Sequence, residues 1–252
     1  MIAIISDVHG NLEALDAVLA DIDRRGAERV WCLGDLVGYG PDPAACVARV
    51  LDRCERVLMG NHDHAMLFGS VGFNETARAS LDYARRCLEP SWRSLPGTRR
   101  RWRALRALPL EIREEGIACY HASPRDPLNE YLLRTDCQTN RDKLREALRK
   151  IDGLCVVGHT HVAGVITERF EFLAPAELMG GYLVGPQAKA IVNAGSVGQP
   201  RDGDPRASYC TVDADHRVRI VRVDYDRDAT TKKIRRTKSL APQLAERLER
   251  GV

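Results

Sequence analysis

Five short polar motifs stand in order along this chain of 252 residues, and most of its histidines belong to them. The motifs are Asp7-Val8-His9, Gly34-Asp35, Gly60-Asn61-His62-Asp63, Tyr120-His121 and Gly158-His159-Thr160-His161. Six of the seven histidines fall within or beside them, whereas histidines that serve as ordinary polar surface would be scattered. Imidazole, carboxylate and amide groups are metal ligands, so this concentration predicts a metal site.

The chemistry that such ligands suit best is displacement at phosphorus. Two metal ions about 3.5–4 Å apart stabilise both the attacking and the leaving oxygen of an in-line displacement. Such a pair needs a bridging carboxylate, and Asp35 is the candidate because an anionic oxygen can bind two cations and offset their repulsion. Mixed nitrogen and oxygen ligands favour two divalent transition-metal ions, with Mn expected and Fe, Zn, Co or Ni also suited to these ligands.

The elements that position the motifs are short apolar runs followed by helical patterns. Residues 1–6, 30–33 and 56–59 are strand candidates, and a motif begins where each run stops. Apolar residues at helical spacing predict helices over residues 12–22 and 46–54. In open α/β sheets, ligand sites gather outside the carboxyl ends of the strands, and the motifs obey this rule.

The rest of the chain contains one helical segment and many short strands. Residues 64–109 are expected to be mostly helical and to form a cap. A further helix is expected over residues 139–151. Strands are expected at residues 110–113, 117–121, 154–157, 164–172, 182–184, 190–192, 208–212 and 218–223. An α/β start followed by many strands predicts two stacked sheets with helices outside.

The five motifs resemble those of the calcineurin-like metallophosphoesterase superfamily, over roughly residues 1–223. Residues 193–204 resemble the loop that follows the last ligand motif in small prokaryotic members, which are phosphodiesterases or phosphatases. The resemblance implies the fold class, a four-layer α/β/β/α sandwich of two mixed β-sheets flanked by helices. It also implies a division of ligands, with Asp7, His9 and His161 on one ion and Asn61, His121 and His159 on the other.

His62 is not a ligand by this resemblance, and its expected role is that of general acid. An imidazolium beside the leaving oxygen can protonate the departing alkoxide, while the nucleophile is a metal-bound hydroxide. Asp63 is expected to orient the His62 ring by accepting from its other nitrogen. Two structural alternatives stay open at this stage, namely that Asp63 and Asp7 only cap the helices that follow them.

Substrate contacts are expected from Asn61, Tyr39 and Arg201. Protein serine/threonine phosphatases carry an arginine soon after the Gly-Asp motif, and Tyr39 stands at roughly that place, which disfavours a phosphoprotein substrate. Arg201 could supply the phosphate contact instead, because a guanidinium fits phosphate oxygens with two parallel hydrogen bonds. The alternative for Arg201 is a solvated arginine in a turn.

Composition and length favour one intracellular domain. With 44% hydrophobic residues the chain can bury a full core, and we expect a metallophosphoesterase domain over residues 1–225 with its helical cap at about 64–109. Residues 226–252 are expected to be a basic tail, a loop followed by a short helix at 240–250, peripheral to the chemistry. Eight cysteines without a C-x-x-C pair indicate reduced thiols. The amino-terminal apolar run is too short for a signal peptide, so a cytoplasmic location without a membrane partner is expected.

The sequence therefore predicts a metal-dependent phosphoesterase acting on a phosphodiester or a small phosphomonoester. A phosphoprotein phosphatase and a dinucleoside polyphosphate hydrolase are the nearest alternatives. A non-catalytic scaffold of the same fold belongs to another class. A nucleic-acid-binding protein does too, because basic clusters lie at residues 99–103, beside Trp102, and at 232–238, although the net charge is only +3. The sequence assigns no oligomeric state.

Overall fold

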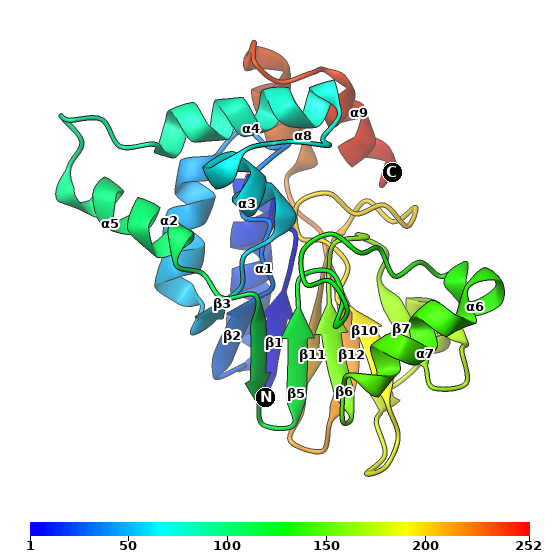
Figure 1. Cartoon of the computed structure of the whole chain (residues 1–252). Helices are drawn as coiled ribbons and strands as arrows, with labels where there is room; N and C mark the ends of the chain where they lie inside the picture. The colour runs from blue at the N-terminus through cyan, green and yellow to red at the C-terminus, as the bar shows by residue number, and fades with distance from the viewer.

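The computed structural model describes all residues, 1–252, and contains two mixed six-stranded sheets (Figure 1). The first sheet has the strand order β3-β2-β1-β11-β12-β9. β1 is parallel to β2 and antiparallel to β11, and β2 is parallel to β3. The carboxyl ends of β1, β2 and β3 therefore meet at one edge of the sheet. Its strands are β1 (Ile2–Ile5), β2 (Arg29–Cys32), β3 (Arg56–Val57), β9 (Tyr182–Leu183), β11 (Ala207–Val212) and β12 (Arg217–Val223).

The second sheet has the order β4-β5-β6-β10-β7-β8, and its central strands β5, β6 and β10 are parallel. The prediction of one strand over residues 164–172 is wrong. The chain turns at Phe170, which has a φ of 60° and donates its N–H to the Thr167 carbonyl, so β7 and β8 form a hairpin. The strands are β4 (Glu111–Glu114), β5 (Ile117–Tyr120), β6 (Leu154–Val157), β7 (Gly164–Thr167), β8 (Phe172–Leu173) and β10 (Ala190–Asn193).

The two sheets pack face to face over an apolar core, which confirms the four-layer prediction. Alternate residues of a strand point to opposite faces, so Ile2 and Ile4 of β1 enter the core between the sheets. There they join Cys119 and Val156 from the second sheet. Ala3 of β1 belongs to a separate core cluster on the helical side of the first sheet.

Helices cover the outer face of each sheet. On the first sheet lie α1 (Leu12–Arg25) and α2 (Pro43–Arg53), and on the second lie α6 (Asp136–Thr139) and α7 (Arg141–Arg149) (Figure 1). The side chain of Asn11 caps α1 by accepting the N–H of Ala14, and Gly26 ends the helix in the left-handed conformation. The short connections from β1 to α1 and from β2 to α2 hold their motif loops at the edge of the first sheet where the carboxyl ends of these strands meet.

The segment expected to be helical between residues 64 and 109 contains α3 (Asn61–Phe68), α4 (Glu75–Leu88) and α5 (Pro96–Arg106). Leu81 and Leu105 are buried in the same cluster as α1 and α2, so this segment extends the helical layer of the first sheet. Trp102 packs partly buried against that cluster.

We expect Leu105→Ala to destabilise the protein by about 2–5 kcal/mol, because Leu105 is fully buried and its truncation leaves a cavity. Leu95→Ala provides the matched control on the same segment, since Leu95 is 75% exposed. Urea unfolding curves of both variants measure the difference. Equal midpoints for the two variants would show that α5 does not pack as the structure shows.

The carboxyl-terminal residues correct a second prediction. Residues 227–236, expected as a loop, form α8 (Arg227–Arg236), which precedes α9 (Gln243–Arg250). The side chain of Asp226 caps α8, and Ile234 packs with Leu244 and Leu248 of α9. This helix pair is attached to the motif loops, because the Thr230 hydroxyl donates to Asn11 and Lys233 forms an ion pair with Asp42.

Candidate metal centre

The motif residues follow strands directly and converge at the edge where the carboxyl ends meet. The predicted ligands Asp7, His9, Asp35, His121, His159 and His161 are all buried, and Asn61 is half-buried at the start of α3. Five of these ligands and Tyr39 are non-glycine residues with positive φ, between 47° and 65°. This left-handed conformation costs on the order of 1 kcal/mol per residue and is typical of functional sites.

Glycines in the motifs permit the close approach of these loops. A side chain at Gly158 would place its Cβ 2.4 Å from Oδ2 of Asp7. A side chain at Gly60 would place its Cβ 2.1 Å from Oδ1 of Asp35. Both contacts are shorter than real Cβ atoms allow, so only glycine at these positions lets the carboxylates occupy the site.

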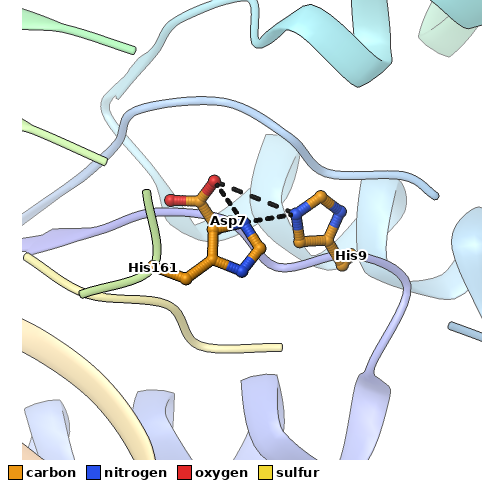
Figure 2. A group of neighbouring side chains, drawn as sticks. All are labelled: Asp7, His9 and His161. Atoms are coloured by element: carbon orange, nitrogen blue, oxygen red, sulfur yellow. Dashed lines mark hydrogen bonds and ion pairs between the residues drawn. The ribbon is translucent and has the colours of Figure 1, made fainter. Parts of the chain in front are cut away.

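The first ligand group contains Asp7, His9 and His161 (Figure 2). The Nε2 atoms of His9 and His161 lie 3.1 Å apart. Oδ1 of Asp7 lies 3.2 Å from Nε2 of His161 and 3.8 Å from Nε2 of His9. Atoms that bind one ion at about 2.0–2.2 Å are about 3.0–3.5 Å apart in tetrahedral or octahedral geometry. The two separations from Nε2 of His161 lie in this range and suit a shared ion, whereas the 3.8 Å separation between Asp7 and His9 exceeds it.

The second ligand group contains Asp35, His121 and His159. Oδ2 of Asp35 lies 3.5 Å from Nε2 of His121, and Oδ1 of Asn61 lies 3.0 Å from the same nitrogen. Oδ2 of Asp35 also lies 3.6 Å from Nε2 of His9, which belongs to the first group. One carboxylate oxygen is thus shared between the two groups, as the candidate bridge requires.

Backbone carbonyls hold the histidine rings through their second nitrogen. Nδ1 of His9 lies 3.0 Å from the Val37 carbonyl, and Nδ1 of His121 lies 3.0 Å from that of Leu33. Each Nδ1 can donate to its carbonyl, which leaves Nε2 as the lone-pair atom that faces the ligand group. His159 has the opposite arrangement, with Nε2 3.3 Å from the Asn129 carbonyl, so its Nδ1 is the free nitrogen.

The His62 ring lies at the edge of the same cluster. A ring nitrogen of His62 comes within 4.8 Å of ligand atoms of His9 and Asp35, so it too stands close enough to reach an ion. The His62 ring packs against Tyr39 with a centroid distance of 4.6 Å and against Phe73 at 5.0 Å. Its Nδ1 is buried without a hydrogen-bond partner.

The structure contradicts the prediction that Asp63 orients the His62 ring. Its carboxylate accepts the backbone N–H groups of Leu36, Val37 and Gly60 instead. Because Asp63 is the third residue of α3, its side chain points back over the helix start and satisfies the free amide of Gly60. Asp63 therefore caps α3, the alternative that the sequence left open. It also binds the loop that follows Gly34-Asp35 to the start of this helix.

Arg201 and Tyr39 lie together beside the first ligand group. The guanidinium carbon of Arg201 is 5.5 Å from the Tyr39 ring centroid, and the Tyr39 ring is 4.7 Å from that of His9. Arg201 donates to Oε1 of Gln199 at 2.9 Å, while its Nε is buried without a partner. Arg201 is thus a half-buried cation with free donor capacity, and the alternative of a solvated turn arginine does not describe it.

Comparisons with known proteins agree with this geometry. The family model of the calcineurin-like phosphoesterase superfamily domain matches residues 1–217. The chain belongs to this superfamily. A metallophosphoesterase from Sphaerobacter thermophilus has a similar crystal structure, with 35% identity, a TM-score of 0.82 and coverage of 100% of this chain and 98% of that one. An uncharacterized protein of Methanocaldococcus jannaschii is 37% identical over 100% of this chain and 98% of its own length.

A shorter match connects the chain to enzymes of known type. A symmetrical bis(5'-nucleosyl)-tetraphosphatase of Erwinia tasmaniensis is 33% identical over 78 residues, which is 29% of this chain and 28% of that enzyme. The superfamily membership and the phosphoesterase neighbours make this protein a metallophosphoesterase, a hydrolase of phosphoric esters. None of the helices of this phosphoesterase combines the length and apolar character needed to cross a bilayer.

The charges of the phosphoesterase site suit divalent cations. Burial and then the negative charges of Asp7 and Asp63 raise the pKa of Asp35. Burial lowers the pKa of His121, and burial followed by the neighbouring His121 lowers the pKa of His159 to about 3. Neutral imidazoles present lone pairs, and the positive charge of Arg201 only partly offsets the clustered carboxylates, so a bound cation would stabilise them. The residues present therefore fit divalent metal ions.

Some residues that line this phosphoesterase site stand in none of the five motifs. The Tyr131 ring packs on His159 with a centroid distance of 4.0 Å, and the neighbouring Asn129 carbonyl holds the same histidine. The Gln199 carbonyl lies 2.6 Å from Nδ1 of His161. Backbone carbonyls are present at every residue, and Tyr131 stands in no motif, so only the tertiary structure identifies them.

We expect Mn²⁺ to raise the Tm of the metal-free protein by about 5–10 °C when it is present at 100 times its Kd. Binding at that ratio stabilises the folded state by about 2.7 kcal/mol, and the resulting shift follows from the size of the chain. Mg²⁺ and Ca²⁺ should produce smaller shifts because they bind imidazole weakly. An unchanged Tm on addition of Mn²⁺ to protein treated with EDTA would contradict the metal site.

Proposed function

We propose that this protein hydrolyses a phosphodiester or a small phosphomonoester with two divalent transition-metal ions, Mn²⁺ being the expected ion. The observation that carries the proposal is Oδ2 of Asp35, which lies 3.6 Å from His9 of one ligand group and 3.5 Å from His121 of the other. Three overlapping sets of ligand atoms join the groups through His9 and Asp35. A single oxygen that faces both groups is what a bridged pair of ions requires.

Bound ions would activate water for attack and neutralise the charge of the phosphoester. The chain's own residues bind and orient the ester. In this proposal Arg201 contacts a phosphate oxygen through its free donor, Asn61 contributes its amide from the start of α3, and Tyr39 holds both Arg201 and His62 in place. Burial, followed by the nearby positive charges of His161 and Arg201, lowers the pKa of His62 in the free protein. The negative charge of the bound ester would favour the protonated ring, which would then present its proton to the leaving oxygen.

The substrate is proposed as a small phosphate ester in the cytoplasm. The match to bis(5'-nucleosyl)-tetraphosphatases, although it covers only 29% of the chain, favours dinucleoside polyphosphates as the second candidate. All eight cysteines are free thiols and six of them are buried, which is typical of cytosolic proteins.

Turnover of three substrates by protein reconstituted with Mn²⁺ tests this proposal. Bis(4-nitrophenyl) phosphate, 4-nitrophenyl phosphate and diadenosine tetraphosphate represent the diester, the monoester and the dinucleoside polyphosphate. We expect a kcat/KM for one of the first two to exceed that of the third by at least tenfold. A preference for the tetraphosphate would select the second candidate, and hydrolysis of none of the three would favour the scaffold. A steep loss of RNA or DNA binding with salt would favour the nucleic-acid alternative.

We expect Arg201→Ala to lower kcat/KM about 10- to 100-fold, because a hydrogen bond from a cation to phosphate contributes about 1.5–3 kcal/mol. Arg206→Ala is the matched control, since Arg206 lies in the same loop region but is exposed and paired with Asp204. Steady-state kinetics of both variants provide the measurement. If Arg201→Ala and Arg206→Ala had the same kcat/KM, Arg201 would not contact the substrate.

A further inference from the structure

An apolar cavity of about 240 Å³ opens on the outer face of the second sheet. Its floor is formed by β6, β10 and β7 through Val157, Ile191 and Ile166, and its walls include Leu132 and Phe172. On this face α6 and α7 cover part of the sheet (Figure 1), and their buried apolar residues form one core cluster with Cys155, Ala118 and the floor residues. Part of the apolar sheet surface is therefore left open between α6 and the β7–β8 hairpin.

A second, larger cavity of about 670 Å³ adjoins the first and is lined by several charged side chains. The two cavities share Arg134, Val162 and Phe172 as lining residues. Two aspartates, Asp202 and Asp204, also line the larger cavity. Five arginines line it, so positive charge exceeds negative charge there: Arg25, Arg134, Arg206, Arg219 and Arg222.

Arg134 differs from the other arginines because it has no carboxylate partner. Each of the other four is paired, Arg25 with Asp21, Arg206 with Asp204, Arg219 with Asp213 and Arg222 with Asp202. Arg134 is exposed and stands where the apolar cavity meets the cationic one. An unpaired guanidinium at the mouth of an apolar pocket offers both charge and hydrogen bonds to an anion.

This pair of cavities is separate from the metal centre. None of the predicted metal ligands lines either cavity. Thr160, which lies between His159 and His161, contributes to the wall of the apolar cavity, and its hydroxyl accepts a hydrogen bond from Asn193. A ligand in the cavity would therefore contact the back of the loop whose histidines face the metal centre.

We propose that the two cavities form a second binding site for a small anionic amphiphile, a molecule with a compact apolar body and a phosphate, carboxylate or sulfonate group. The apolar body would fill the 240 Å³ cavity, where burial of apolar surface against the sheet is favourable. The anionic group would lie at the junction and contact Arg134. An uncharged apolar molecule would leave this cation unused, and inorganic phosphate would leave the apolar floor open to water.

The fluorescent dye 8-anilinonaphthalene-1-sulfonate is a suitable probe, and its neutral analogue N-phenyl-1-naphthylamine is the matched control ligand. We expect one sulfonate dye to bind per folded chain, equally in EDTA and in Mn²⁺. Arg134→Ala should weaken binding of the sulfonate dye at least tenfold and change that of the neutral dye less than twofold. Arg149→Ala, an exposed arginine on α7 outside both cavities, should change neither.

A second variant tests the apolar cavity. Thr135→Trp should abolish binding of both dyes with an unchanged Tm, because Thr135 lines the cavity, is exposed and makes no capping hydrogen bond through its side chain. Displacement of the dye by AMP would indicate a purine as the natural apolar body, and displacement by decanoate an acyl chain. Displacement by neither, or unchanged binding of the sulfonate dye to Arg134→Ala or Thr135→Trp, would overturn the proposal.

Discussion

Asp35→Asn should reduce phosphoester hydrolysis by at least about 10³-fold and lower the metal content of the purified protein, the largest effect that we expect. The asparagine amide retains an oxygen that can accept the backbone N–H of His62, as Oδ1 of Asp35 does at 2.8 Å. It removes the anionic oxygen that faces His9 and His121 and so the charge that offsets repulsion between two cations. Metal analysis and kcat/KM measured on the same preparation test both parts.

The control for this prediction is Asp142→Asn, the same chemical change at a side chain that is 87% exposed. This variant should keep the activity and metal content of the unsubstituted protein. If Asp35→Asn also kept two ions per chain and full turnover, Asp35 would not be the bridge, and the proposed arrangement of two ions would be wrong.

His62→Ala should lower kcat about 10²- to 10⁴-fold for esters with poor leaving groups while the metal content stays unchanged. A positioned acid contributes about this much when an alkoxide must be protonated as it leaves. The effect should be much smaller for 4-nitrophenyl esters, because nitrophenolate leaves without protonation. Comparison of methyl 4-nitrophenyl phosphate with an alkyl phosphodiester therefore separates acid catalysis from a general loss of structure.

His64→Ala is the natural control, because His64 lies two residues further on the same helix. Its ring packs on Phe68, 4.8 Å between centroids, and it belongs to none of the three ligand sets. Activity of His64→Ala should stay within twofold. A loss of bound metal in His62→Ala would instead assign His62 as a ligand, which its distance from His9 and Asp35 permits.

Much of the fold was predictable because local patterns and tertiary packing agree. The run at β1 is continuously apolar since one face packs on the second sheet and the other on α1 and α2. The hairpin of β7 and β8 was missed because Phe170 adopts a left-handed φ of 60° that no local residue signal indicates. The helix α8 was not predicted because only Thr230, Thr231 and Ile234 of its residues are buried, which leaves little apolar periodicity in its sequence. Its position depends on contacts with Asn11 and α9.

The sequence by itself singled out the residues that converge at the candidate metal centre, because imidazole, carboxylate and amide groups stand at the ends of several apolar strands. It excluded His62 as a ligand, whereas the structure places a His62 nitrogen near His9 and Asp35. The sequence could not decide the contacts made by Asp63, since a carboxylate at that position can serve a ring nitrogen or a helix cap equally well. Three backbone amides from two loops decided it. Likewise, the unpaired Arg134 and the open face of the second sheet arise from contacts between segments far apart in the chain, which residue order alone does not specify.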